Sequence, residues 1–215
     1  KNLPAHFYDE FKTICTNPCA EIPLSAYDSC RLISLNLTAY VNAPFEPHAN
    51  FDFDRFKADV AIATRLSDDL VELELELIRQ IRDGAKNKIE KKLWHKLHEA
   101  ARLGRRIGLG THGLGDTLAQ LRMKYNSDSA THITGDIYAS LRDNAYTASI
   151  NLAKERGAFP VFNWDKEKGC EFFKRMPSAI LNTMKVSGRR NISLLTNAPT
   201  GTVAMMSKTT SGIEP

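Results

Sequence analysis

Hydrophobic and polar residues alternate with two different periods along the chain, and these periods predict its elements. Ile33, Leu35 and Leu37 alternate with polar residues, which is the period of a half-buried strand. From about Asp54 to Ile81, apolar residues recur every three or four positions and predict one long helix. The apolar stripe of this helix consists of Phe56, Val60, Ala63, Leu70, Leu73 and Leu77.

The stretch at 71–77 also fits a strand, because apolar residues and glutamates alternate there. The helical stripe continues through it, and leucine and glutamate favour helices, so we assign it to the long helix. Gly104 and Gly157 each follow a helical stretch and predict where two other helices end. The remaining predicted elements are helices at 88–103, 113–123, 134–156 and 177–186, a strand at 192–195 and a loop at 197–201.

Strands separated by long helical connections predict an α/β fold. We divide the chain into a loop and strand at 1–41, a mainly helical region at 42–190, and a strand and loop at 191–215. The chain has no initiator methionine and stops just after a predicted loop, so we expect it to be an internal segment of a longer protein.

The composition narrows the class of protein. A hydrophobic content of 42% and a charged content of 25% are ordinary for a soluble globular protein. The net charge of +4 is mild and the basic residues are scattered, so we expect no nucleic-acid binding. No apolar run matches a membrane span, and no signal peptide opens the chain. Four cysteines are too few for a secreted disulfide scaffold, which favours the cytoplasm.

An amide, a thiol and a carboxylate fall within five residues, in the run Asn-Pro-Cys-Ala-Glu at 17–21. A thiol can act as a nucleophile, a redox carrier or a radical site, and a neighbouring carboxylate can take a proton. Pro18 fixes one φ angle and biases Asn17 away from helix, so the run predicts a rigid loop. From these residues alone, a purely structural loop with a buried cysteine is equally open.

Three blocks of sequence, which together span nearly the whole chain, resemble the large subunit of ribonucleotide reductases and occur in that family's order. The Asn-Pro-Cys form and the eleven-residue gap from Cys19 to Cys30 resemble the adenosylcobalamin-dependent class most closely. The blocks are residues 17–24 with 29–30 and 34–37, residues 105–110, and residues 198–203 with 211–215.

The resemblance implies both a fold and an activity. The fold would belong to a ten-stranded α/β barrel, with the loop that carries Cys19 in its centre. The activity would be reduction of ribonucleotides to 2′-deoxyribonucleotides, a reaction whose hard radical step belongs to a cofactor. The resemblance further implies adenosylcobalamin, a ribonucleoside di- or triphosphate substrate, a thioredoxin-like dithiol reductant, and a homodimer of the full-length protein.

The same resemblance assigns roles to single residues. Cys19 would become a thiyl radical that takes the 3′-hydrogen, Glu21 would accept the 3′-hydroxyl proton, and Asn17 would hold the ribose. Cys30 would be one half of a reducing dithiol whose partner lies upstream of this segment. The block at 199–203 would bind the substrate phosphates at a helix start, and no residue is assigned to a metal. The expected substrate-binding residues are Asn17, Pro18, Cys19, Ala20, Glu21, Pro199, Thr200, Gly201, Thr202 and Val203.

Two further patterns are interpreted as structural. The glycines at 108–113 fit the spacing of a dinucleotide-binding loop, but that loop must follow a strand and the preceding residues resemble a helix end. We therefore expect a glycine-rich connection between helices. His95 and His98 share a helix face without other metal ligands, so we expect both to be solvated surface residues.

Three alternatives stay open. The chain could belong to a class I-type large subunit, which draws its radical from a partner subunit's metal centre. It could be a catalytically incomplete piece that acts only as an assembly or interaction module. It could also belong to a polar thiol enzyme with Cys19 as nucleophile, which needs a nearby base such as histidine. His6 is the nearest histidine in the sequence.

Overall fold

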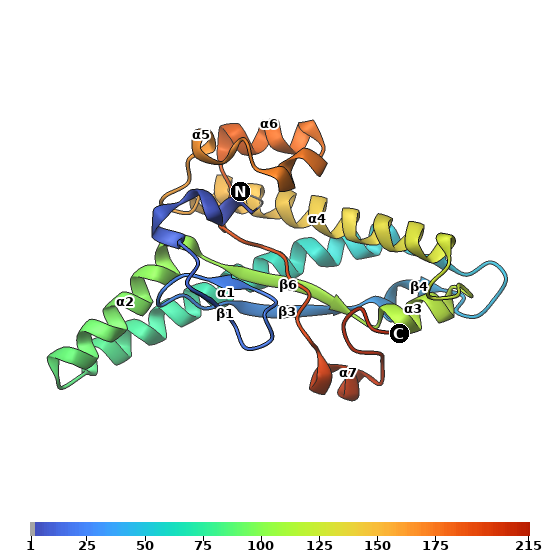
Figure 1. The fold of residues 1–215 in the computed structure, drawn as a ribbon, viewed down its shortest axis with the longest axis horizontal. Helices are drawn as coiled ribbons and strands as arrows, with labels where there is room; N and C mark the ends of the chain where they lie inside the picture. The colour runs from blue at the N-terminus through green and yellow to red at the C-terminus, as the bar shows by residue number, and fades with distance from the viewer. Residues whose placement is uncertain (1–2) are drawn as a thin grey trace.

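Two parallel strands lie at the centre of the fold, with helix α1 packed on both of them and helix α4 packed on α1 (Figure 1). The structure is a computed structural model that describes residues 3–215, so the first two residues of the predicted loop-and-strand region lie outside the described residues. The central strands are β3 (Arg31–Asn36) and β6 (Ile107–His112). Arg31 lies opposite Ile107, and Asn36 lies opposite His112. The described residues therefore have a mixed α/β fold.

The other elements surround this pair. The helices are α1 (Phe53–Gly84), α2 (Lys88–Gly104), α3 (Leu114–Gln120), α4 (Asp128–Arg156), α5 (Trp164–Glu167), α6 (Ser178–Ser187) and α7 (Gly201–Ser207). The short strands form two antiparallel pairs, β1 (Cys15–Thr16) with β2 (Pro23–Leu24) and β4 (Val41–Asn42) with β5 (Asn50–Phe51). The 3-10 helices are η1 (Pro4–Phe7), η2 (Asp9–Phe11), η3 (Leu37–Tyr40) and η4 (Glu171–Arg175).

Local sequence signals explain where the long helices begin and end. The side chains of Asp52, Asn87 and Ser127 accept hydrogen bonds from backbone N–H groups in the first turns of α1, α2 and α4. Gly157, at φ +85°, follows the last residue of α4 as predicted. The predicted helices are all present, and 71–77 is helical. Helix α4 begins earlier than predicted because Ser127 caps it.

The buried face of α1 differs from the predicted stripe in the second half of the helix. Leu73 and Leu77 are about half exposed, at 52% and 49%, whereas Val71 and Leu75 are buried. The predicted stripe counted only apolar residues, and polar residues occupy core positions in the middle of the helix. The residues that α1 buries are Phe56, Val60, Ala63, Thr64, Ser67, Asp68, Val71, Leu75 and Ile78.

The glycine-rich run at 108–113 lies in strand β6 up to His112, so the predicted connection between helices was wrong. All six residues of β6 are buried. A Cβ on Gly108 would lie 2.7 Å from Cys30 Sγ, and one on Gly110 would overlap the carbonyl oxygen of Thr196. Glycine is needed because neighbours approach the backbone of β6 this closely, yet glycine in a strand usually weakens the sequence signal for one.

The predicted strand at 192–195 is an extended segment with a single bridge, from Leu195 to Leu109. The N–H groups of Ile107 and Leu109 donate to the carbonyls of Ser193 and Leu194. The segment therefore follows the edge of β6 that faces away from β3, without a regular ladder.

The histidines of α2 do not share one environment. His95 is exposed, as predicted, but His98 is buried, with 8% of its surface exposed. The expectation for His98 was wrong because α2 turns that face, with Ala101 and Gly104, inward, and α2 packs against α1. None of the helices within residues 3–215 is long and apolar enough to cross a lipid bilayer.

Asp68 in the middle of α1 is fully buried and is bound by groups from three other segments. Its Oδ1 accepts hydrogen bonds from Arg105 Nη2 at 2.8 Å and from Asn191 Nδ2 at 3.0 Å. Its Oδ2 accepts from Arg190 Nε and Arg156 Nη1, each at 3.3 Å. A buried charge is tolerated only when it is paired and hydrogen-bonded in this way. Asp68 therefore joins α1 to the ends of α2 and α4 and to the segment at 190–191.

We predict that Asp68→Asn lowers the free energy of unfolding by about 3–5 kcal/mol. The reason is that the buried guanidinium groups of Arg105 and Arg190 then keep only the half-exposed carboxylate of Glu72 as a counter-charge. Glu171→Gln is the matched control: it breaks the exposed ion pair between Glu171 and Lys174, which should cost less than about 1 kcal/mol. Urea unfolding of both variants measures the difference. Equal losses in the two variants would contradict a special role for Asp68.

Candidate active site

The run Asn-Pro-Cys-Ala-Glu at 17–21 forms the tip of the hairpin made by β1 and β2. The Ala20 N–H donates to the Asn17 carbonyl at 3.0 Å, and the Ile22 N–H donates to Asn17 Oδ1 at 2.9 Å. Ala20 adopts φ 61°, in the left-handed region, which closes the turn. The tip is therefore the rigid loop that the sequence predicted, with the Asn17 side chain as one of its internal braces.

The two reactive groups of this tip differ in exposure. The Cys19 thiol is exposed, which rules out the buried structural cysteine considered above. Glu21 is partly buried, and its Oε2 is buried without a hydrogen-bond partner among the described residues. Such an oxygen is unusual and marks a site where a further donor can bind.

Thr196 attaches the hairpin to the edge of β6, a role that the sequence did not reveal. Its Oγ1 donates to the Glu21 carbonyl at 3.0 Å, and its N–H donates to the Leu109 carbonyl at 3.1 Å. No motif or spacing marks this threonine, because the two partners are distant in sequence. The hairpin tip and the segment that leads to α7 are therefore held together.

Cys30 directly precedes β3 and is partly buried. Burial raises the pKa of the Cys30 thiol to about 12, and the guanidinium groups of Arg106 and Arg31 oppose this rise. The thiol is therefore protonated at neutral pH. The Glu21 carboxylate also acts on this pKa, so Cys30 and Glu21 lie within electrostatic reach of each other.

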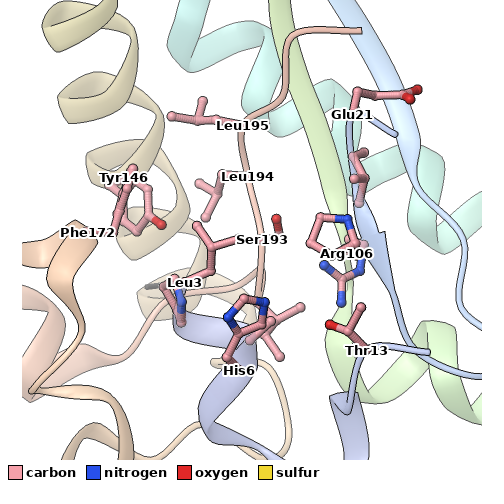
Figure 2. A pocket seen from close by; sticks show the side chains of 15 residues that line it. Leu3, His6, Thr13, Glu21, Arg106, Tyr146, Phe172, Ser193, Leu194 and Leu195 are labelled. Atoms are coloured by element: carbon pink, nitrogen blue, oxygen red, sulfur yellow. The ribbon is translucent and has the colours of Figure 1, made fainter. Parts of the chain in front are cut away.

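A cavity of about 210 Å³ lies beside the hairpin, with Glu21 and Arg106 in one wall and Leu194 in the opposite one (Figure 2). His6 also lines this cavity, whereas neither Cys19 nor Cys30 does. The histidine that a polar thiol mechanism would need is thus directed to a different space from the exposed thiol.

The third sequence block surrounds helix α7. Thr200, the residue before α7, is buried, and its Oγ1 accepts a hydrogen bond from the Gly212 N–H at 2.9 Å. This contact brings together the two halves of the block, 198–203 and 211–215. Gly201, Thr202 and Val203 are exposed in the first turn, where backbone N–H groups lack intrahelical partners. A Cβ on Gly201 would meet no atom within 4 Å, so its backbone faces open space.

The other end of α7 is tied to β6 by His112. His112 is buried, with Nε2 3.2 Å from Ser207 Oγ and Nδ1 2.8 Å from Ser34 Oγ. Burial lowers the pKa of His112 below its ordinary value, so the imidazole is neutral at pH 7 and can accept one of these bonds while donating the other. Within residues 3–215, no group of three or more His, Cys, Asp or Glu side chains could hold a metal ion.

The fold and the site define a class of protein: an α/β domain that holds a cysteine-tipped hairpin against a parallel strand pair. The family described as "Ribonucleotide reductase, barrel domain" matches residues 5–215. The chain belongs to the ribonucleotide reductase family.

Three relatives show how the similarity is distributed. The vitamin B12-dependent ribonucleoside-diphosphate reductase of Mycobacterium tuberculosis is 34% identical over 93% of this chain and 24% of its own length. The enzyme of the same name from Thermoplasma acidophilum is also 34% identical, over 93% of this chain and 22% of its own. The ribonucleoside-diphosphate reductase subunit alpha of Chlamydia pneumoniae is 26% identical, over 94% and 20%. The chain thus spans about a quarter of the length of the first two relatives.

A solved structure agrees with the fold. The class Id ribonucleotide reductase alpha subunit of Actinobacillus ureae superposes with a TM-score of 0.62, at 22% identity, over 100% of this chain and 34% of its own. At this identity the similarity concerns the fold alone.

We predict that Gly110→Ala destabilises the protein by about 1–3 kcal/mol, because the new methyl group must displace backbone rather than a side chain. Gly135→Ala is the control, since a Cβ at this exposed position of α4 meets nothing within 4 Å and should stabilise the helix by up to about 1 kcal/mol. Denaturant unfolding compares the two. A neutral Gly110→Ala would show that Thr196 is not held against β6.

Proposed function

We propose that this chain is a segment of the catalytic barrel domain of an enzyme that reduces ribonucleotides to 2′-deoxyribonucleotides through a thiyl radical. The exposed thiol of Cys19, at the tip of a hairpin braced from two sides, is the observation that carries the proposal. A radical site must be reachable by its radical source and its substrate, and rigid enough to aim at one hydrogen atom. Family membership and the names of the relatives support the assignment.

We further propose that β3, β6 and the segment at 192–196 are three neighbouring strands of a ten-stranded barrel with the Cys19 loop in its centre. The parallel pairing of β3 with β6 supports this, as does the extended course of 192–196 along the opposite edge of β6. In this arrangement residues 1–41 and 191–215 supply the site, and the helical region at 42–190 supports it.

In the proposed mechanism, the Cys19 thiyl radical takes the 3′-hydrogen of the substrate and Glu21 accepts the 3′-hydroxyl proton. The buried Oε2 of Glu21, which lacks a partner among the described residues, is suited to receive that proton. Asn17 uses Oδ1 to brace the turn, so its Nδ2 group would donate to the ribose. Pro18 and Ala20 shape the turn around Cys19.

Cys30 would supply a hydrogen and, with a cysteine outside this chain, two electrons, leaving a disulfide that a thioredoxin-like dithiol reduces. Its protonated state at neutral pH, which follows from its raised pKa, is the state that hydrogen donation needs. Its electrostatic coupling to Glu21 supports a shared site.

Residues 199–203 would bind the substrate phosphates through backbone N–H groups at the start of α7. Thr196 contacts the hairpin, and Thr200 follows four residues later, so their Cα atoms are at most about 14 Å apart. A ribonucleoside di- or triphosphate can bridge a distance of this order from the hairpin to α7. The side chains of Pro199, Thr202 and Val203 would frame the phosphates.

Adenosylcobalamin is the proposed cofactor and would supply the radical chemistry when bound. The relatives named as vitamin B12-dependent share more identity with this chain than the Chlamydia subunit alpha does, which favours this cofactor over a class I-type radical partner. The exposure of Cys19 fits a radical source that approaches from outside the described residues, and we assign no described residue to hold the corrinoid. We also propose that the full-length protein is a homodimer in the cytoplasm.

We predict that Cys19→Ser in the full-length protein abolishes deoxyribonucleotide formation, because an oxygen cannot easily replace sulfur as the hydrogen-abstracting radical. Cys15→Ser is the matched control: Cys15 is another exposed cysteine of the same hairpin, and its loss should leave turnover unchanged. Product formation from a ribonucleotide is measured for both. Turnover by the Cys19 variant would end the radical assignment.

We predict that Gly201→Val weakens substrate binding without unfolding the protein, because the added side chain enters open space that the phosphates would fill. Thr202→Ala should cost only about 0.5–1.5 kcal/mol of binding free energy, the value of one hydrogen bond. Nucleotide affinity and thermal stability are measured in the full-length protein. Normal binding by the Gly201 variant, with loss of binding in Thr202→Ala, would refute a backbone site.

A further inference from the structure

A buried ion pair holds the segment that carries Cys30, and the mechanism above gives it no role. Arg106 is 2% exposed, and its Nε donates to Asp28 Oδ2 at 2.7 Å. The Asp28 side chain is fully buried. Asp28 lies two residues before Cys30, and Arg106 directly precedes β6. The pair therefore fixes the approach to Cys30 against the strand on which the thiol packs.

The Asp28 carboxylate also organises the turn before Cys30. Its Oδ1 accepts the Ser29 N–H at 2.9 Å, and its Oδ2 accepts the Ser25 hydroxyl at 3.1 Å. Each oxygen of the carboxylate is thus used within this turn, and Oδ2 is shared with Arg106. Asp28 therefore positions the backbone on the N-terminal side of Cys30, and Arg106 in turn positions Asp28.

Arg31 holds the other side of Cys30. Its Nη1 donates to the carbonyls of Ser29 and Arg106, each at 3.2 Å, and its Nε forms an ion pair with Glu74 of α1. The Arg106 carbonyl thus contacts one arginine while the Arg106 guanidinium binds Asp28. The residues on both sides of Cys30 are thus held by arginines whose guanidinium groups are themselves fixed by hydrogen bonds.

Four charged groups act on the Cys30 thiol together with burial. The guanidinium groups of Arg106 and Arg31 favour its thiolate, and the carboxylates of Asp28 and Glu21 disfavour it. Arg106 and Asp28 belong to one ion pair but shift the pKa of the thiol in opposite directions. Single substitutions can therefore distinguish the electrostatic effect of Arg106 on the thiol from the structural support that the ion pair gives to the turn.

We propose that Arg106, held by Asp28, is a positioning residue that stabilises the thiolate of Cys30. The proposal rests on the proposed role of Cys30 as a reducing thiol. When a dithiol reductant opens a disulfide at Cys30, a thiolate of the reductant bonds to the partner sulfur, the S–S bond breaks, and Cys30 leaves with the bonding electron pair. The fixed charge of the Arg106 guanidinium, which favours the Cys30 thiolate, lowers the free energy of that leaving thiolate. Burial then favours uptake of a proton, which restores the thiol.

The test is the rate at which iodoacetamide alkylates Cys30 at a fixed pH of about 8, a rate that follows the thiolate fraction. Full-length Arg106→Gln should react roughly tenfold more slowly, the effect of about one pKa unit from a lost neighbouring cation. Asp28→Asn should react faster than the parent protein. Peptide mass spectrometry resolves each cysteine, so Cys19 serves as an internal control whose rate should not change.

A merely structural ion pair predicts a different pattern. Either substitution would loosen the turn and expose Cys30, so both variants would react faster. Alkylation of Arg106→Gln at or above the parent rate therefore overturns the proposal. If Arg106→Gln does not fold, Arg106→Lys decides, because it keeps the positive charge while it disturbs the ion pair. A rate close to that of the parent protein supports the electrostatic effect, whereas a rate as high as that of Asp28→Asn overturns it. The result is independent of turnover: the reducing role of Cys30 is tested separately by deoxyribonucleotide formation in Cys30→Ser.

Discussion

The buried carboxylate of Asp68 is the interaction on which the placement of the site depends. It binds Arg105 and Asn191, and each of these residues stands at the beginning of an element that carries the site. Arg105 leads into β6, and Asn191 leads into the segment at 192–196. Taking a carboxylate out of water costs several kcal/mol, which the surrounding hydrogen bonds must offset. The same charge therefore fixes the relative position of both elements, because a shift of either one removes a donor from the buried Oδ1 of Asp68.

Residues that pack closely against β6 connect the Asp68 cluster to the reactive groups of the site. With glycine at 108 and 110, the backbone of Thr196 and the thiol of Cys30 can lie directly against the strand. Thr196 in turn holds the carbonyl of Glu21, and so positions the hairpin tip. The chain of contacts runs from a buried ion cluster through a glycine strand to the exposed Cys19. The site is rigid at its base and open at its tip.

The sequence predicted the helices because their signals are local. Capping side chains such as Ser127 and stop signals such as Gly157 act within one turn, and they need no tertiary context. Strand β6 was missed because its glycines are needed for the close approach of Thr196, a residue about ninety positions away in the sequence. The second half of the α1 stripe was misplaced for a similar reason, since Asp68 occupies a core position that only its distant arginines make tolerable. Residue identities of the site came from the resemblance, whereas Thr196 and Asp28 carry no motif at all.

The proposed role of Cys30 as a reducing thiol would require burial and charge to be balanced at its sulfur. As a hydrogen donor it has to be protonated near pH 7, and burial against β6 ensures this by raising its pKa. As the leaving group of a disulfide it has to carry a negative charge for a moment, which burial alone would oppose. Two arginines fixed by their own partners supply a positive field that costs no reorganisation when the charge appears. Burial, together with the carboxylates of Asp28 and Glu21, keeps that field from holding Cys30 as a permanent thiolate. Under this proposal, burial meets the first demand by keeping the thiol protonated, and the charges of Arg106 and Arg31 meet the second by favouring the thiolate.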